Sequence, residues 1–377
     1  MRLQMDRKLI YDVTEFKYSR DIVKRLPYPF FSLNKITGGA EIGNLVILFA
    51  KSNQGKSELC MQFISFWVSI NEKVVAMLGE HTMRKAQGLL YKKVSKYDKD
   101  KWITKSYGKD ADGKDWGIYE TFISEEDEAK AINIFKGKLF LYDTRNGFDL
   151  NTIIKAFEEG KKKGCSIAIL DNQMMIDLDS NNELREQTDN TEKLRQWAKQ
   201  NQMVIFLIAH SRKVETDRIR LTETDIAGSS NISNKATTIM TLVRTNTLDP
   251  NSKEYKYYSK LLEYNYIDIK KCDAILEVVK EKNGIGVGFV PLKWYNSTKT
   301  FREVYDPEMI QKREGDKRER ELRYQNGDDG QEEKPTLFIN QSEMQELSSA
   351  ELSKVDKIFG DTPKSESVGF DDGTLPY

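Results

Sequence analysis

Cysteine, histidine and proline are scarce in this chain of 377 residues, which holds 3 cysteines, 2 histidines and 8 prolines. Cys60, Cys165 and Cys272 are widely separated, so they form neither a zinc-ribbon pattern nor a disulfide framework. The longest apolar runs, at 45–50 and 203–209, have the length of strands and are far too short to cross a bilayer. The N-terminus has no apolar core of the signal-peptide kind. We therefore expect no membrane partner and a protein of the reducing cytoplasm.

Charge is balanced over the whole chain but is unevenly distributed along it. Lysine and arginine together number 59, as do aspartate and glutamate. Residues 326–377 hold twelve acidic residues and only four lysines, a balance of −8, so residues 1–325 carry +8. A basic body with an acidic tail suits a polyanionic partner, although the balance alone identifies none.

Apolar runs of strand length alternate with helical patterns through the body of the chain. The expected strands are 45–50, 74–78, 139–143, 166–170, 203–209 and 239–243. The expected helices are 57–70, 83–97, 124–135, 150–163 and 183–201, with a short one around 19–25. The alternation predicts an α/β fold with a mostly parallel central sheet flanked by helices. Residues 273–305 predict a C-terminal antiparallel hairpin, and 106–117 predict a polar surface loop.

The strand at 45–50 leads into AKSNQGKS (50–57), which fits the phosphate-loop pattern GxxxxGKS except that Ala50 replaces the first glycine. In such a loop, backbone N–H groups surround phosphate oxygens, the lysine reaches the terminal phosphates and the hydroxyl binds Mg²⁺. The apolar strand before the motif and the amphipathic helix after it argue against a chance match. We predict a site for ATP, or another NTP or dNTP, made by Ala50, Asn53, Gln54, Gly55, Lys56, Ser57 and Glu58.

Two acidic residues at strand ends complete a candidate hydrolytic site. Asp171 ends the strand of SIAILDN, where it can hold Mg²⁺ together with Ser57. The residue after it is Asn172, which disfavours the NTPase families that place their catalytic glutamate there. Glu80, in VVAMLGEHTM, ends the strand that follows the phosphate-loop helix, where it can position the attacking water. This arrangement points to a RecA-like P-loop NTPase core.

The motifs between residues 27 and 305 resemble, in order, those of the C-terminal motor domain of DnaB-type replicative DNA helicases and of their phage and Twinkle-like relatives. FFSLNKITGGAEIGNLVILFAKSNQGKS resembles the lead-in and phosphate loop of that family, and LGEHT resembles its catalytic-glutamate motif. LRQWAKQNQMVIFLIAHSRK resembles its sensor strand, which ends here in His210. LTETDIAGSSNISNKATTIMTLVR resembles its channel-facing segment, and VVKEKNGIGVG resembles its K-x-R-x-G stretch.

The resemblance implies that one chain supplies half of a hydrolytic site, made by Lys56, Ser57, Asp171 and Glu80. It implies that His210 senses the γ-phosphate, and that Lys280 and Lys282 complete the site of a neighbouring subunit in a homohexamer. Lys282 stands where the family has arginine and lacks the planar guanidinium, so hydrolysis should be weaker or assisted by a residue such as Arg244. From the residues alone, a core role for His210 and a solvated position for the two lysines remain alternatives.

The resemblance also implies contacts between the ring channel and single-stranded DNA. The candidate DNA-binding residues follow the sensor strand and are Arg212, Lys213, Gly228, Ser229, Ser230, Asn231 and Lys235. Small residues let backbone N–H groups approach phosphate oxygens without reading the sequence of the strand. Arginine is frequent in the family where this chain has Ala227, so that contact is absent here. Arg185 and Lys193 are weaker candidates.

The predicted organisation is an N-terminal docking arm (1–26), a RecA-like motor domain (27–310) and a charged, largely disordered acidic tail (311–377). The tail ends in SVGFDDGTLPY, similar to the terminal peptide of bacterial single-stranded-DNA-binding proteins, so a primase, polymerase or loader is its expected partner.

The predicted function is an ATP-dependent, ring-forming replicative DNA helicase that moves 5′ to 3′ on single-stranded DNA, by analogy with the family. A bacteriophage source is expected, which would place the protein in the host cytoplasm. The alternatives are a RecA/RadA-like recombinase and an ATP-gated DNA-binding or loading factor with weak hydrolysis.

Overall fold

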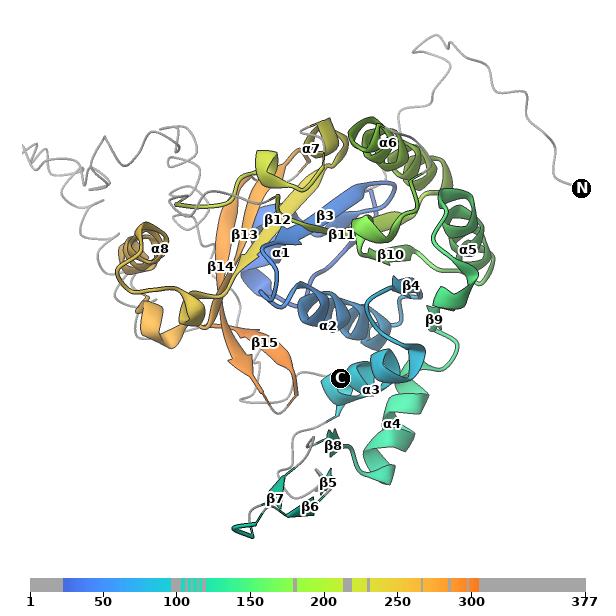
Figure 1. Ribbon diagram of the computed structural model, residues 1–377. Coiled ribbons are helices and arrows are strands. Elements are labelled where there is room, and N and C mark those ends of the chain that lie inside the picture. Colours follow the sequence, from blue (N-terminus) through green and yellow to red (C-terminus); the bar gives the residue numbers. More distant parts are fainter. Residues whose placement is uncertain are drawn as a thin grey trace, which may run out of the picture.

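A nine-stranded sheet forms the centre of the computed structural model (Figure 1). The structure describes residues 23–95, 103–105, 108–109, 111–113, 115–116, 120–178, 182–212, 219–228, 231–265, 267–283, 286–296 and 298–304. The strand order is β15-β14-β13-β12-β3-β11-β10-β4-β9. All neighbouring strands from β12 to β9 are parallel, whereas β13, β14 and β15 continue the sheet in antiparallel fashion.

The parallel strands are β3 (Leu45–Ala50), β4 (Val74–Leu78), β9 (Leu139–Leu141), β10 (Ile167–Asp171), β11 (Val204–His210) and β12 (Thr238–Val243). The antiparallel strands are β13 (Ala274–Glu281), β14 (Gly288–Tyr295) and β15 (Thr300–Glu303). Each predicted parallel strand is confirmed to within two residues at either end. The predicted hairpin at 273–305 has three strands and not two, because β15 pairs with β14.

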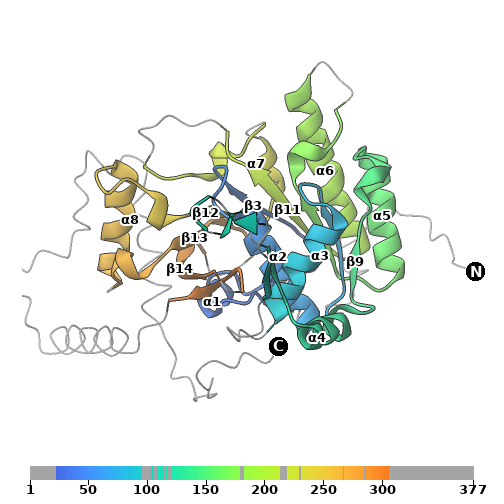
Figure 2. The same ribbon diagram turned by 60° about the horizontal axis from the view of Figure 1, so that its bottom comes forward.

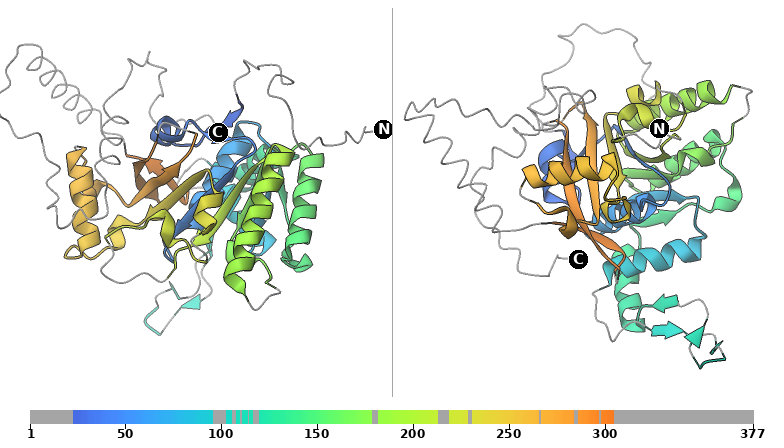
Figure 3. Two further views of the ribbon diagram at one scale, coloured as in Figure 1. Left: turned by 90° about the horizontal axis from the view of Figure 1, so that it is seen from above. Right: turned by 60° about the vertical axis from the view of Figure 1, so that its left-hand side comes forward.

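Helices cover both faces of the sheet (Figure 3). On one face lie α1 (Phe31–Thr37), α2 (Lys56–Ser69), α3 (Met83–Val94) and α4 (Glu125–Phe135). On the other lie α5 (Leu150–Lys162), α6 (Glu183–Asn201) and α7 (Asn231–Lys235). In β3, Val46 and Leu48 belong to the first core and Ile47 and Phe49 to the second. Because side chains alternate between two buried faces, the strands read as continuous apolar runs.

Several helices begin at a residue whose side chain accepts a hydrogen bond from the first turn. Thr82 caps α3, Ser124 caps α4, Asp149 caps α5 and Asn182 caps α6. Such caps satisfy backbone N–H groups that have no partner within the helix. They explain why the predicted starts of these four helices agree with the structure to within one residue.

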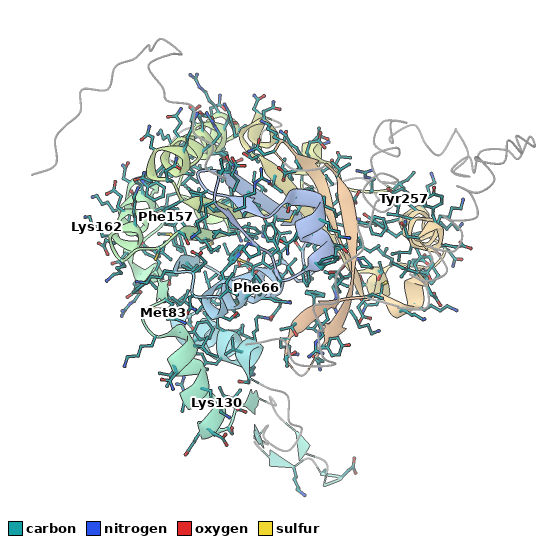
Figure 4. The ribbon with its side chains drawn as sticks, turned by 180° about the vertical axis from the view of Figure 1, so that it is seen from behind. Phe66, Met83, Lys130, Phe157, Lys162 and Tyr257 are labelled. Carbon is teal, nitrogen blue, oxygen red and sulfur yellow. The ribbon has the colours of Figure 1, made fainter. Side chains whose placement is uncertain are left out.

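Three α-helices of the described residues were not predicted, the five-residue α7 and two longer helices. The first of these two is α1, which ends at Gly38 in the left-handed conformation, with φ of 70°. The second is α8 (Lys253–Tyr264), which lies between β12 and β13 and is capped by Ser252. Around α8 a third core gathers Tyr257, Tyr258 and Leu262. Figure 4 labels Tyr257 at one side of the molecule, far from Lys162 of α5 at the other.

Short strand pairs replace two predicted features. Arg25–Leu26 (β1) pair with Ala40–Glu41 (β2), so the expected helix around 19–25 is wrong at its described end. Within the predicted surface loop at 106–117, β6 (Gly108–Lys109) pairs with β7 (Asp115–Trp116). On either side of that loop, β5 (Ile103–Lys105) pairs with β8 (Glu120–Phe122). These two small sheets project from the body beyond α3 and α4 in Figure 1, and they lie in front of the body when its bottom is turned forward in Figure 2.

The ends of the chain lie outside the described residues. The predicted arm falls on 1–22 for most of its length, and the acidic tail lies entirely beyond Val304. The domain boundaries therefore stay predictions. Among the described residues, no helix combines the length and the apolar character that a membrane span requires.

Candidate active site

The phosphate loop connects β3 to α2 at the carboxyl edge of the parallel strands. Gly55, the residue before α2, has φ of 91°, and Asn53 has φ of 62°, so both adopt the left-handed conformation that turns the loop. A Cβ atom on Gly55 would lie 3.4 Å from the ring of Phe301 on β15. The sequence pattern is explained by this geometry, because the loop needs a left-handed residue without a side chain here. Backbone N–H groups at the start of α2 are then directed at the site of the phosphates.

Lys56 is buried within the loop. Its amine donates to the carbonyls of Ala50 at 3.4 Å and Lys51 at 3.2 Å, and lies 3.4 Å from Nδ1 of His210. Burial lowers the pKa of the Lys56 amine, while the charges of Asp171 and Glu80 act in the opposite direction. The loop thus holds a cation whose carbonyl partners can be exchanged for phosphate oxygens.

Asp171, at the end of β10, is 1% exposed. Ser57 donates a hydrogen bond to its carboxylate, yet Oδ1 has no hydrogen-bond partner among the described residues. Burial raises the pKa of Asp171 to about 6, and the hydrogen bond from Ser57 only partly offsets this. A desolvated carboxylate with a bare oxygen next to a hydroxyl fits Mg²⁺, which keeps water and phosphate oxygens as its remaining ligands. Among the described residues, no cluster of three His, Cys, Asp or Glu side chains offers another metal site.

Glu80, Asn172 and His210 converge from three different strands. Glu80 follows β4, and its Oε1 accepts a hydrogen bond from Nδ2 of Asn172 at 2.7 Å. Nε2 of His210 lies 3.3 Å from the same amide nitrogen and 3.6 Å from Oε1 of Glu80. Burial, and then the charge of Lys56, lower the pKa of His210, so its imidazole is neutral at neutral pH. Nδ1 faces the Lys56 amine and Nε2 faces the Asn172 amide, which are both donors, so the neutral ring accepts from only one of them at a time.

Ion pairs with partners that the sequence did not single out brace this loop. Glu58 pairs at 2.7 Å with Lys93 of α3, whose side chain is fully buried and also donates to the carbonyl of Lys299. Lys51 pairs at 2.8 Å with Glu254 of α8. The partners lie 35 and 203 residues apart in sequence, so no local spacing could have indicated these contacts.

Arg244 lies beside the phosphate loop of its own chain. Its backbone N–H donates to Oε1 of Gln54 at 2.6 Å, and its guanidinium carbon is 6.0 Å from the ring centroid of Trp294. As the residue that follows β12, it sits at the same edge of the sheet as the loop. Lys280 and Lys282, the two cations that the resemblance assigns to the site of a neighbouring subunit, do not lie at this end of the strands.

Lys280 and Lys282 lie farther toward the amino ends of the parallel strands than the phosphate loop does. Lys280 is in register with Ile239 of β12, which is in register with Ile47 of β3, about 10 Å before the end of that strand. Its amine donates to the carbonyl of Ser233 at 2.6 Å, and that of Lys282 donates to the carbonyl of Asn234 at 3.3 Å. Both lysines are thus held against α7 and directed away from their own phosphate loop.

The structure places only part of the predicted DNA-binding segment. Arg212 pairs with the buried Asp225 at 3.1 Å, and Lys235 pairs with Glu192 at 3.2 Å. Gly228 has φ of 101° and lies against Gln187 of α6, so a side chain would not fit there. Asn231 begins α7. Lys213, Ser229 and Ser230 lie outside the described residues.

The comparisons agree with this geometry. A family model described as the DnaB-like helicase C terminal domain matches residues 26–303. A solved structure described as an ATPase domain superposes with a TM-score of 0.58 at 19% identity, over 75% of this chain and 92% of that chain. A DnaB-like replicative helicase, solved to show its interactions with primase, superposes with a TM-score of 0.57 at 18% identity, over 75% of this chain and 64% of the other. No curated protein matches the sequence.

Proposed function

The chain belongs to the family of DnaB-like helicase C-terminal domains, whose members are ATP-hydrolysing replicative DNA helicases. From this premise we propose that six copies of the chain form a ring that moves 5′ to 3′ along single-stranded DNA. The observation that carries the proposal is the separation of two sets of groups. Lys56, Asp171 and Glu80 meet at the carboxyl ends of the parallel strands, whereas Lys280 and Lys282 lie farther toward the amino ends. A complete site then requires two chains.

The half-site at the carboxyl edge would bind the nucleotide. Asn53, Gln54 and Gly55 form the loop around the phosphates, Lys56 leaves its carbonyl partners for the terminal phosphates, and Glu58 holds the first turn of α2 through Lys93. Ser57 and Asp171 would hold Mg²⁺, which supplies charge neutralisation for phosphoryl transfer when bound. Glu80 would orient the attacking water, since its carboxylate is exposed enough to reach solvent and is held by Asn172.

His210 would report the state of the phosphate to the DNA-binding segment. Its ring touches Lys56 on one side and the Glu80–Asn172 pair on the other. Its backbone carbonyl accepts a hydrogen bond from Ala227 at 2.7 Å, one residue before Gly228. A shift of Lys56 toward phosphate would therefore change the contacts of the residue that anchors the DNA-binding segment.

In a ring, Lys280 and Lys282 of one copy would approach the triphosphate held by the next. Lysine supplies charge without the paired hydrogen bonds of an arginine, so we expect slower hydrolysis than an arginine would support. The ring would grip DNA through Arg212, Gly228, Asn231 and Lys235, together with Lys213, Ser229 and Ser230. A bacteriophage source, the host cytoplasm, and a primase, polymerase or loader as partner of the acidic tail remain parts of this proposal.

The recombinase and the loading factor remain the competing functions. Replacing Glu80 by Gln tests the proposed hydrolytic site, because it removes the water-positioning charge and keeps the side-chain shape. We expect ATP hydrolysis stimulated by single-stranded DNA to fall by about 10²-fold or more, fork unwinding to stop, and nucleotide binding to persist. Glu158→Gln, on the exposed side of α5, is the matched control and should behave as wild type.

The wild-type protein separates the alternatives in the same assays. Nucleotide binding without turnover would favour the loading factor, and joint-molecule formation without unwinding would favour the recombinase. Full hydrolysis by Glu80→Gln would contradict the site assignment.

A further inference from the structure

Six lysines gather where strands β9, β4 and β10 begin, at the amino edge of the sheet. We call them the lysine rim, which consists of Lys73, Lys136, Lys138, Lys161, Lys162 and Lys163. Lys73 precedes β4, Lys138 precedes β9, and the last three end α5, just before β10. The starts of these strands are in register, Val74 with Leu139 and Ile167 with Val74, so the rim is contiguous.

Contacts between neighbours hold the rim together. The Lys73 amine donates to the carbonyl of Lys163 at 3.2 Å, and the carbonyl of Lys138 accepts from Val74 at 2.8 Å. The amine of Lys163 lies 5.2 Å from the centroid of the Phe140 ring. Lys136 and Lys162 are exposed, and Figure 4 labels Lys162 at the outer side of the molecule.

The nearby acids neutralise the rim only in part. The carboxylate of Glu72, which precedes Lys73, already accepts from Lys24 at 2.7 Å and from Ser166 at 2.6 Å. Glu158 and Glu159 of α5 are exposed beside its last lysines, so the six lysines exceed the three carboxylates of Glu72, Glu158 and Glu159 by three charges. The predicted DNA-binding segment follows the carboxyl end of β11, which is the other end of the strands. The rim therefore has no role in the site described above.

We propose that the lysine rim is the docking surface for the acidic C-terminal segment 326–377 of this same protein. The segment has a net charge of −8, which complements the rim. The sheet is nine strands wide, so its far edge is about 40 Å from β15. Asn326 lies 22 residues beyond Val304, a span of about 70 Å when extended, so the segment reaches the rim. Tethering also gives it a millimolar effective concentration, which a free polyanion must exceed to displace it.

Zero-length coupling with a carbodiimide tests the proposal in the full chain. The reagent condenses a carboxyl group and an amine into an amide with loss of water, so only touching groups are joined. We expect mass spectrometry to find amides between acids of 326–377 and lysines of the rim. Because exposed charges are screened over about 8 Å at physiological salt, the yield should fall several-fold between about 0.05 and 0.5 M salt.

A pair of charge-matched variants makes the test specific. Lys136→Glu combined with Lys162→Glu should lower coupling to the rim several-fold. Lys253→Glu combined with Lys256→Glu, on exposed positions of α8, changes net charge equally and should leave it unchanged. Both variants keep the hydrolytic site, so basal hydrolysis should stay at the wild-type level whatever the coupling shows.

Two outcomes would overturn the proposal. The first is coupling of the tail to the rim no more often than to the lysines of α8. The second is photocrosslinking of a single-stranded oligonucleotide to the rim at low salt while the tail stays uncoupled, which would make DNA the occupant.

Discussion

The carboxyl and amino ends of the parallel strands handle charge differently. At the carboxyl end, Asp171 and Lys56 are buried and lie within one polar network that includes Glu80 and His210. At the amino end, lysines either face solvent or donate to backbone carbonyls, as Lys280 does to Ser233. Burial strengthens electrostatics at the first end, and exposure keeps cations available at the second. The carboxyl end has the buried nucleotide-binding groups, and the amino end has the available cations. A site shared between two copies requires both.

The largest expected effect comes from removing the cation of the carboxyl end. Lys56→Ala should lower ATP hydrolysis by about 10³-fold or more, because phosphoryl transfer depends on a positive charge held at this position in the loop. Steady-state hydrolysis with saturating Mg²⁺ and DNA measures it. Lys51→Ala, in the same loop, removes only a partly exposed ion pair with Glu254 and should cost less than tenfold. Equal losses in the two variants would show that the loop, and not the Lys56 charge, matters.

At the other end, Lys282→Ala should lower kcat by about 10-fold to 10³-fold and leave nucleotide affinity nearly unchanged. Lys282→Arg should raise kcat above that of the wild type, since a guanidinium offers paired donors to phosphate oxygens. Lys270→Ala, on an exposed part of the chain before β13, is the matched control. A Lys282→Ala variant with wild-type kcat would remove this residue from the chemistry.

Burial of Asp171 has a measurable cost for folding. Its pKa is raised from about 3.8 when unfolded to about 6, so the folded state is favoured when the group is protonated, and that contribution is lost as pH rises from 4 to 6. Asp171→Asn removes the charge and should stabilise the Mg²⁺-free protein at pH 7.5 by on the order of 3 kcal/mol. Urea unfolding should show this gain shrinking toward pH 4. A variant less stable than the wild type at pH 7.5 would contradict the account.

The amino end also contributes through packing. A Cβ atom on Gly160 of α5 would lie 2.6 Å from Cγ1 of Val75 on β4, so Gly160→Ala should destabilise the fold by about 1–3 kcal/mol. Gly88→Ala is the opposite control, because no atom lies within 4 Å of its Cβ position in α3. That change should stabilise the helix by about 0.5–1 kcal/mol. Thermal melts of both variants compare the two, and equal shifts would show that Gly160 is not closely packed.

The sequence predicted the buried half of this comparison well, for a physical reason. Strands buried on both faces have continuous apolar sequences, and the carboxyl ends of parallel strands meet, so Glu80 and Asp171 were expected together. His210 was added to them by the family resemblance. Charged residues with buried partners carry no such pattern. Lys93 reads as a solvated residue of a helix, yet its side chain is fully buried beside Glu58. Arg220 and Glu277 pair at 3.1 Å with side chains 9% and 8% exposed, across 57 residues. Helix α8 was missed because its apolar face serves a separate core.

Mixing two inactive variants tests most directly whether the site is shared between copies. Lys56→Ala keeps Lys280 and Lys282 but cannot hold the phosphates, whereas Lys280→Ala combined with Lys282→Ala keeps the phosphate loop but lacks the completing charges. When the two are mixed and allowed to exchange subunits, hydrolysis should rise well above the sum of the separate activities. Hydrolysis that stays at that sum, or a double lysine variant that is fully active alone, would contradict a site completed by a second copy.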